Sequence, residues 1–180
     1  MTTPTTITIQ RVGPDIPSWA EDRAWLAEAY CDAIAEELTH SWVQTIRRVD
    51  RNRRDEIMDM LSPLLLQKDR ACLLVARHAA ARVGYFLGLV KDCVAEVPAA
   101  VGYVNGLYVA TEYRRLGIAG HLYTEGRKWF AAQGLTAVEL YTAVGNAAAS
   151  AFWRKHGFCV TEEVMVARLG ESPLITTTTE

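Results

Sequence analysis

The sequence predicts a mixed α/β domain that occupies the whole chain, residues 1–180. Its length of 180 residues suits one domain, because domains usually run to about 100–200 residues. Hydrophobic residues make up 50% and charged residues 22% of the chain, a composition typical of globular proteins and unlike that of disordered ones. The spacing of apolar residues switches between a helical period and strand-like alternation, which predicts the element order β-α-α-β-β-β-α-β-α-β.

Three elements are expected in the first part of the chain. Residues 7–10 alternate apolar and polar side chains, which predicts a short strand that the Gly-Pro pair at 13–14 ends. Residues 18–49 carry an apolar stripe at spacings of three and four, which is typical of a helix. A second helix is expected at 54–67, with a kink at Pro63 because proline lacks the backbone N–H of a helix interior.

The second part of the chain is expected to alternate strands and helices. Apolar runs at 71–77 and 82–90, separated by a short Ala-rich turn, predict a hairpin. The elements expected after it are a strand at 101–110, a helix at 117–133, a strand at 137–143, a helix at 146–156 and a final strand at 158–168. Residues 1–6 and 176–180, polar and rich in threonine, are expected to be frayed.

Charge and cysteine content exclude several function classes. Nineteen basic and 21 acidic residues give a net charge of −2, which offers no general attraction to nucleic acid or to an anionic membrane. Cys31, Cys72, Cys93 and Cys159 form no C-x-x-C pair, so neither a metal site nor a disulfide framework is expected. The N-terminus lacks the features of a signal peptide, and no apolar run approaches the roughly 20 residues of a membrane span. We therefore expect a soluble, cytoplasmic protein.

The most informative segment is Tyr-Arg-Arg-Leu-Gly-Ile-Ala-Gly at 113–120, between an expected strand and an expected helix. Its small residues Gly117, Ala119 and Gly120 let a ligand approach the backbone, and the first N–H groups of a helix have no internal partner. These features suit a pyrophosphate, to which Arg114 and Arg115 could add charge. The alternative is that the glycines only permit close packing. The spacing fits neither a P-loop nor the dinucleotide-binding fingerprint.

A second segment lies about 30 residues further on, at 146–158. Asn146 is placed to cap a helix whose apolar side chains recur on one face, and by itself this is an ordinary amphipathic helix. The pair of segments, Tyr-Arg-Arg-Leu-Gly-Ile-Ala and then N-x-x-A-x-x-F-W-x-K-x-G-F, resembles the GNAT superfamily of acyl-CoA N-acyltransferases. The resemblance covers residues 101–158 closely, and the element order of the whole chain is compatible with it.

This resemblance implies a fold and a cofactor site. The fold would be of the α+β type, with a central, mixed, mostly antiparallel twisted sheet flanked by helices. The backbone of Leu107, Tyr108 and Val109 would bind the pantetheine arm of acetyl-CoA, beside Asn146. A bulge at Gly106 would suit such a close approach. The pyrophosphate cradle would consist of Arg114, Arg115, Leu116, Gly117, Ile118, Ala119 and Gly120.

The implied activity is acetyl-CoA-dependent N-acetylation, in which a primary amine of a small molecule or peptide attacks the thioester directly. The amine must be neutral, although an alkyl ammonium has a pKa of about 10.4, so neutrality at pH 7.4 costs roughly 4 kcal/mol. Relatives often have a tyrosine as proton donor where this chain has Trp153 and a glutamate where it has Asn105. The indole of Trp153 cannot act as an acid near neutral pH, and the amide of Asn105 cannot act as a base.

Three interpretations therefore stay open. Tyr141 is the first candidate for the proton donor, because strand alternation turns it opposite to Leu140 and Thr142. Transfer could also proceed without an acid, since a CoA thiolate is a tolerable leaving group and proximity supplies much of the acceleration. The third interpretation is an acyl-CoA-binding regulatory or interaction module with little or no turnover.

For four other titratable residues, both a structural and a functional role are considered. His121 and His156 lie on expected helices without ligand spacing, so we expect structural or surface roles and no metal. Glu112 and Glu139 are either distal bases that act through water or surface residues.

The tryptophans of the first part of the chain have a similar ambiguity. Trp19, Trp25 and Trp42 lie where relatives build the wall of the acceptor pocket, so they either cover a ligand or pack in the core. Many relatives form homodimers through strand edges, and a homodimer is possible here, although no residue selects an interface.

Overall fold

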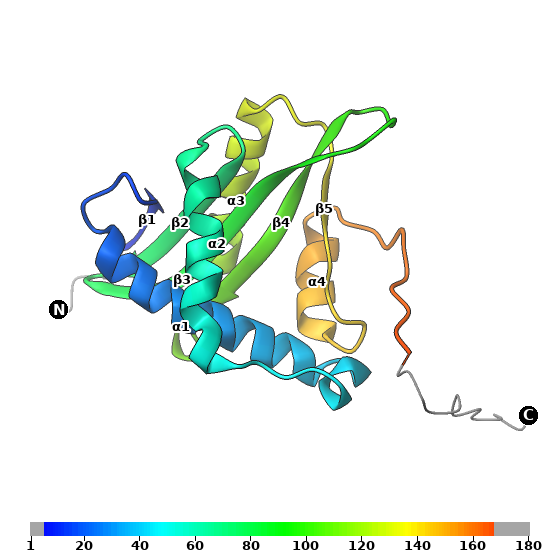
Figure 1. Ribbon diagram of the computed structural model, residues 1–180, viewed down its shortest axis with the longest axis horizontal. Helices are drawn as coiled ribbons and strands as arrows, with labels where there is room; N and C mark the ends of the chain where they lie inside the picture. Colours follow the sequence, from blue (N-terminus) through cyan, green and yellow to red (C-terminus); the bar gives the residue numbers. More distant parts are fainter. Residues whose placement is uncertain (1–5, 168–180) are drawn as a thin grey trace, which may run out of the picture.

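A computed structural model describes residues 6–167 of the chain, arranged around one five-stranded sheet (Figure 1). The strands follow the order β1-β2-β3-β4-β5. The first three neighbouring pairs are antiparallel, whereas β4 and β5 are parallel. The bounds of the strands are β1 (Ile7–Val12), β2 (Ala71–His78), β3 (Ala81–Asp92), β4 (Ala100–Val109) and β5 (Val138–Leu140).

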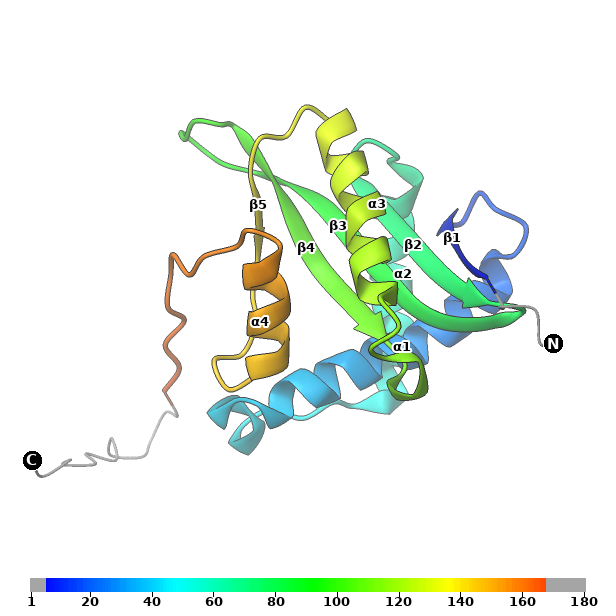
Figure 2. The ribbon, with the colours of Figure 1, turned by 180° about the vertical axis from the view of Figure 1, so that it is seen from behind.

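Helices cover both faces of this sheet, as Figures 1 and 2 show from opposite sides. Helices α1 (Trp19–Thr39) and α2 (Arg54–Leu66) lie on one face, and α3 (Ile118–Ala132) and α4 (Ala147–Lys155) lie on the other. Three short 3₁₀ helices connect the elements: η1 (Trp42–Thr45), η2 (Arg51–Arg53) and η3 (Thr111–Tyr113). The predicted mixed, mostly antiparallel sheet flanked by helices is therefore confirmed.

Each face of the sheet has its own hydrophobic core, because successive side chains of a strand point to opposite sides. Along β3, Tyr85 and Leu87 pack with Leu26 of α1 on one face. Phe86, between them, packs with Phe130 of α3 on the other face. The two cores hold the helices in place on either side of β4, the strand that carries the candidate site.

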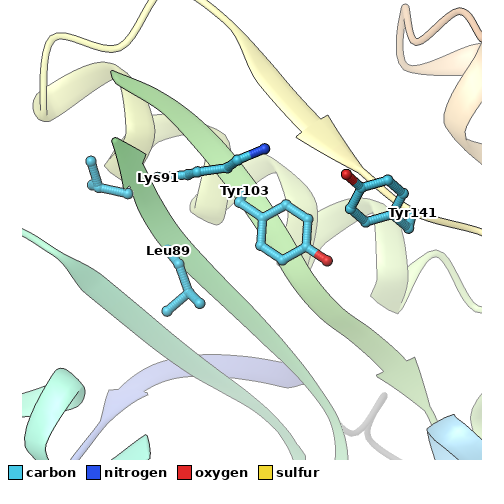
Figure 3. A pocket seen from close by; sticks show the side chains of 5 residues that line it. Leu89, Lys91, Tyr103 and Tyr141 are labelled. Carbon is cyan, nitrogen blue, oxygen red and sulfur yellow. The ribbon is translucent and has the colours of Figure 1, made fainter. Parts of the chain in front are cut away.

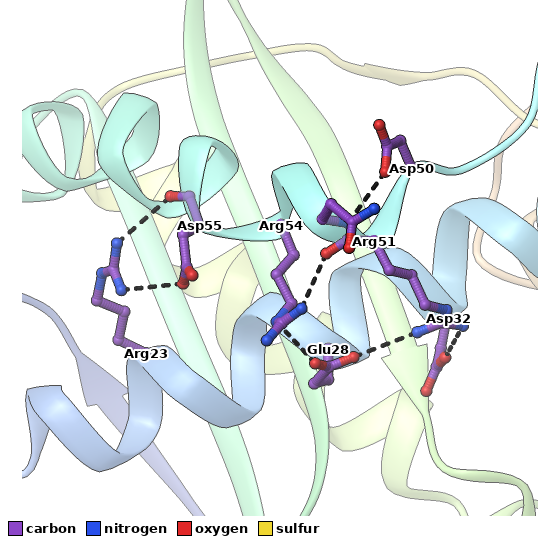
Figure 4. A network of polar contacts seen from close by, with 8 residues as sticks. Arg23, Glu28, Asp32, Asp50, Arg51, Arg54 and Asp55 are labelled. Carbon is purple, nitrogen blue, oxygen red and sulfur yellow. Dashed lines mark hydrogen bonds and ion pairs between the residues drawn. The ribbon is translucent and has the colours of Figure 1, made fainter.

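Ion pairs connect the outer surfaces of α1 and α2 (Figure 4). Arg51 and Arg54 both contact Glu28 of α1, and Arg51 also donates to Asp32. Towards the start of α1, Arg23 contacts Asp55 of α2. All of these side chains are partly exposed, so each pair contributes little to stability.

The first long helix is shorter than predicted. Helix α1 ends at Thr39, whereas the apolar pattern predicts a helix to residue 49. Ser41 has an extended backbone, and its hydroxyl accepts a hydrogen bond from the Val43 N–H, so it caps η1 instead. A serine placed in this way starts a new helix and ends the previous one. The predicted second helix is confirmed, and Pro63 lies inside α2.

The predicted final strand at 158–168 is wrong for the described residues 158–167, which form no strand; residue 168 lies outside the described part. The predicted strand at 137–143 is also shorter, because β5 covers only Val138–Leu140. With no neighbouring strand to pair with, Val160, Val164 and Met165 stay largely exposed. Apolar alternation needs a partner strand to become a strand, and in the described part of the sheet β5 is the edge.

Candidate functional site

The candidate site begins where β4 and β5 separate. The two strands pair over three positions, from Gly102 with Val138 to Val104 with Leu140. From Gly106 to Val109, β4 continues to pair with β3, but within residues 6–167 no strand pairs with its other side. An unpaired strand edge offers backbone donors and acceptors to an extended ligand. The predicted pantetheine-binding residues Leu107, Tyr108 and Val109 lie on this edge.

A β-bulge marks the start of the unpaired edge. Gly88 of β3 is opposite Val104 and Leu87 is opposite Gly106, so Asn105 is the extra residue of β4. A Cβ atom on Gly106 would lie 2.9 Å from the Tyr85 ring, so only glycine fits there. The structure therefore has an irregularity of the strand where the sequence predicted one.

The bulge directs Asn105 towards α1. Its Oδ1 atom accepts a hydrogen bond from the Tyr30 hydroxyl at 2.9 Å. The Tyr30 ring stacks on Tyr85, with centroids 6.2 Å apart. Burial raises the pKa of Tyr30, and Tyr103 adds to this effect, so the phenol is protonated at neutral pH. Sequence reasoning missed Tyr30, because nothing local in α1 distinguishes it from a core tyrosine.

The glycine-containing loop forms a backbone cradle at the start of α3. Arg115 and Gly117 have positive φ angles of 66° and 80°. Gly117 makes no side-chain cap, and the first N–H groups of α3, from Ile118 to Gly120, have no acceptor within the helix. A Cβ atom on Gly117 or Gly120 would meet nothing within 4 Å. An open, uncapped helix start of this kind fits a pyrophosphate.

The two arginines of this loop have different environments. The guanidinium of Arg114 binds both carboxylate oxygens of Glu36 in α1, at 2.8 and 2.6 Å, and its Nε atom donates to the Val109 carbonyl at 2.9 Å. The hydrogen bond with Glu36 raises the pKa of Arg114. Arg115 is exposed and has no partner within residues 6–167. Arg115 is therefore the cation that is free to meet an anion.

Asn146 holds the loop between β5 and α4. As predicted, it caps α4, since its Oδ1 atom accepts from the Ala149 N–H at 3.0 Å. Its Nδ2 atom donates to Glu37 of α1 at 2.8 Å, and Glu37 also accepts from the Thr142 hydroxyl and the Ala143 N–H. Glu36 and Glu37, adjacent in α1, therefore bind the two loops that carry the sequence motifs.

Tyr141 lies beside a cavity on the α1 and α2 face of the sheet (Figure 3). Its side chain is 59% exposed, and its ring meets Tyr103 edge-on, with centroids 5.9 Å apart. The cavity has a volume of about 410 Å³ and is lined by Leu89, Val90, Lys91, Tyr103 and Tyr141. The Lys91 ammonium also binds Glu139 at 2.5 Å, so Glu139 is an ion-pair partner at this surface.

Trp153, at the expected position of the proton donor, is a core residue. It is 8% exposed and packs against Tyr123 and Phe158. His156 is bound to the Phe152 carbonyl through Nδ1, and His121 is exposed on α3.

The remaining candidates lie outside the cavity lining. Trp19 and Trp25 pack against the core under α1, whereas Trp42 is half-exposed. Glu112 is exposed in η3. Between residues 6 and 167, no group of three His, Cys, Asp or Glu side chains could hold a metal ion. In the same part of the chain, none of the helices has the length and apolarity needed to cross a membrane.

Solved structures with the same fold include several acetyltransferases. A GCN5-related N-acetyltransferase from Ralstonia eutropha has a TM-score of 0.69 and 16% identity, over 92% of this chain and all of that one. A "predicted acetyltransferase" from Clostridium acetobutylicum, solved with acetyl-CoA, has a TM-score of 0.70 and 12% identity, over 91% of this chain and 97% of that one. The aminoglycoside 6'-N-acetyltransferase AAC(6')-IG from Acinetobacter haemolyticus has a TM-score of 0.60 and 19% identity, over 92% of this chain and 99% of that one. No curated protein matches the chain.

A sequence-level comparison identifies the family. Residues 27–158 match the profile described as the acetyltransferase (GNAT) family, and this range covers well over half of the chain. It includes the unpaired edge of β4, the glycine loop before α3 and the Asn146 cap of α4. The chain therefore belongs to the GNAT acetyltransferase family.

Proposed function

We propose that this chain is an N-acetyltransferase that transfers an acetyl group from acetyl-CoA to a primary amine of a small molecule or peptide. The observation that carries this proposal is the convergence of two backbone sites on one side of β4. One is the unpaired edge at Leu107, Tyr108 and Val109, and the other is the open cradle from Arg115 to Gly120. Together they match an extended ligand that ends in a pyrophosphate.

Some residues of the chain would bind the pyrophosphate, and others would hold the surrounding loops in position. The N–H groups at the start of α3, with Leu116, Gly117, Ile118, Ala119 and Gly120 contributing backbone, would hold the pyrophosphate, and the free Arg115 guanidinium would add charge. Arg114 would act through Glu36 and Val109, by fixing the loop. Asn146 would shape the opposite wall through Glu37.

The acetyl group would lie where β4 and β5 separate, between Asn105 and Tyr141. The amine nitrogen would attack the thioester carbon directly, and the CoA thiolate would leave with the proton that the amine gives up. Tyr141 is the exposed hydroxyl beside this point and is our candidate to relay this proton, by donating its own to the departing sulfur and taking up the one that the amine gives up. Asn105 would orient the reacting groups without accepting a proton, because an amide cannot do so.

Calorimetric titration with acetyl-CoA, with ATP and NAD as controls, tests the binding part of the proposal. Gly117→Trp should place a bulky side chain at the cradle, where an added Cβ atom meets nothing within 4 Å although the positive φ strains the backbone, and should weaken binding by at least about tenfold, or 1.4 kcal/mol. Gly134→Trp is the matched control, because Gly134 also has a positive φ, of 75°, and open space, but lies at the other end of α3. Equal binding by both folded variants would refute the assignment of the cradle.

A second candidate function is an acyl-CoA-binding module without turnover. It is favoured by the burial of Trp153 and by the amide at Asn105, which together leave the usual proton-transfer positions without an acid or a base. An assay for released thiol with a panel of amines separates the two candidates. Binding without release from any amine would support the module, whereas amine-dependent release would establish the enzyme.

A further inference from the structure

We propose that the acceptor is a weakly basic amine, uncharged at neutral pH, attached to a flat apolar group such as an aryl ring. It would bind in the cavity beside Tyr103 and Tyr141. This inference rests on the proposed acetyl transfer and goes beyond it, because it names the chemical class of the acceptor.

The shape and position of the cavity suit such a group. Tyr103 is opposite Leu89 in the β3–β4 register, so both side chains face the same side of the sheet. The Tyr103 and Tyr141 rings meet at 60° and form two aromatic walls, and Leu89 and Val90 add an apolar wall (Figure 3). Aromatic rings prefer such offset or edge-on contacts with another ring.

The cavity also lies next to the proposed reaction centre. Tyr103 is two residues before the bulge at Asn105, and Tyr141 directly follows Leu140, the last paired residue of β5. An amine nitrogen attached to a ring that packs in the cavity against the two tyrosines would therefore be close to the point where the strands separate.

The charges around this site disfavour a cationic acceptor. The Lys91 ammonium lines the cavity and occupies Glu139, the carboxylate next to it. Glu36 is bound by Arg114, and Glu37 accepts from donors of the loop before α4. An alkyl ammonium would meet the positive charge of Lys91 and would have to displace one of these partners to find a free carboxylate. A neutral amine meets neither obstacle.

The groups that face the reaction point cannot take a proton from an ammonium at neutral pH. Asn105 is an amide, and its oxygen is occupied by the Tyr30 hydroxyl. Burial raises the pKa of Tyr30, and burial together with Tyr141 and Glu139 raises that of Tyr103 against the opposing effect of Lys91, so these phenols are protonated. An alkyl ammonium would therefore carry the full cost of neutrality, roughly 4 kcal/mol at pH 7.4. An arylamine is already neutral and avoids it.

The transfer step balances with such an acceptor. The lone pair of the amine nitrogen forms a bond to the thioester carbon, and the carbon–sulfur bond breaks with its electron pair on sulfur. The nitrogen loses one proton and the departing thiolate gains one, either the same proton or, with Tyr141 as relay, the proton of the Tyr141 hydroxyl, which the proton from nitrogen then replaces. The products are the acetylated amine and the free thiol of CoA, which the assay detects.

The test compares aniline, benzylamine and cyclohexylamine as acceptors in a thiol-release assay with acetyl-CoA. Benzylamine keeps the ring but is strongly basic, and cyclohexylamine is neither flat nor weakly basic. We expect kcat/KM at pH 7 to be at least about 100-fold higher for aniline, in line with the fraction of each amine that is neutral. Between pH 7 and 9, kcat/KM should stay level for aniline and rise about tenfold per pH unit for the other two.

A variant separates the role of charge from that of shape. Lys91→Met leaves Glu139 unpaired beside the cavity, so the ratio of kcat/KM for benzylamine to kcat/KM for aniline should rise severalfold. Lys128→Met is the matched control, because Lys128 also pairs with a glutamate, Glu125, but on the exposed surface of α3. Neither acceptor should respond to it.

The outcomes distinguish this inference from the proposed function. Loss of acetyl-CoA binding would overturn the proposed function itself. Binding with a preference for benzylamine, cyclohexylamine or a polyamine at pH 7 would overturn only the acceptor class, and so would binding without thiol release from aniline. A level pH profile for benzylamine would reveal a base in the protein and would overturn the argument from proton transfer.

Discussion

The buried carboxylate of Asp22 provides a direct test of how α1 is attached to the sheet. Asp22 has no exposed surface, and its Oδ1 atom accepts from Arg77 Nη2 at 2.5 Å and from Arg82 Nε at 2.6 Å. Its Oδ2 atom accepts from the Ser18 hydroxyl at 2.7 Å. The two arginines lie at the β2–β3 hairpin, and only 14% and 17% of their side chains are exposed. Asp22 thus places one negative charge between two nearly buried cations, and Glu21 also contacts Arg82.

We expect Asp22→Asn to lower the free energy of unfolding by about 3–5 kcal/mol, because it removes the charge but leaves both arginines in place. For a domain of this size, 1 kcal/mol corresponds to roughly 2–4 °C in Tm, so Tm should fall by roughly 6–20 °C. Burial would raise the pKa of Asp22, but hydrogen bonds from Arg82, Ser18 and Arg77 outweigh it and lower the pKa.

The lowered pKa also predicts a pH dependence. A carboxyl whose pKa is lower in the folded than in the unfolded state stabilises the fold above its unfolded pKa, and this contribution disappears as the pH falls through the folded pKa. The stability of the natural chain should therefore decrease as the pH falls below about 4, where Asp22 of the unfolded chain takes up a proton more readily than the folded carboxyl does. Asp22→Asn should lose this part of the acid dependence.

Urea unfolding followed by tryptophan fluorescence measures both effects. Glu56→Gln is the control, because Glu56 of α2 pairs with Arg53 of η2 on the exposed surface, where an ion pair contributes little to stability. A loss for Asp22→Asn within about 1 kcal/mol of the control would refute the argument, since buried pairs would then count no more than exposed ones.

Two further predictions concern the loop before α4 and the packing of α3. Glu37→Gln should reduce stability by about 1.5–3 kcal/mol, because a charged acceptor of three hydrogen bonds becomes an amide; an unchanged Tm by calorimetry would contradict this role. Gly126→Ala should cost about 1–3 kcal/mol, because its Cβ would lie 2.3 Å from the Phe86 ring. Gly120→Ala, in open space on the same helix, should instead raise the free energy of unfolding by up to about 1 kcal/mol. An equal change in Tm for the two variants would contradict the prediction, because it would show that packing against Phe86 does not determine the effect of the added methyl group.

Local features of the chain were predictable because they depend on neighbouring residues. The Gly117 loop before α3 and the Asn146 cap of α4 follow from the conformations and hydrogen bonds of a few consecutive residues, and both are present. The strand hairpin at β2 and β3 follows from apolar runs around a short turn. One exception has a local cause as well, because Ser41 caps η1 and ends α1 earlier than the apolar pattern implies.

The sequence alone therefore determined the fold class, the family and the position of the glycine loop before α3, since each rests on short-range patterns. Tertiary structure decided the rest. Asn105 is held by Tyr30, 75 residues away, and Arg114 by Glu36, 78 residues away. The predicted strand at 158–168 failed over residues 158–167 because a strand exists only with a partner. Contacts between distant segments depend on how the helices lie on the sheet, and no periodicity or spacing along the chain encodes which side chains then meet.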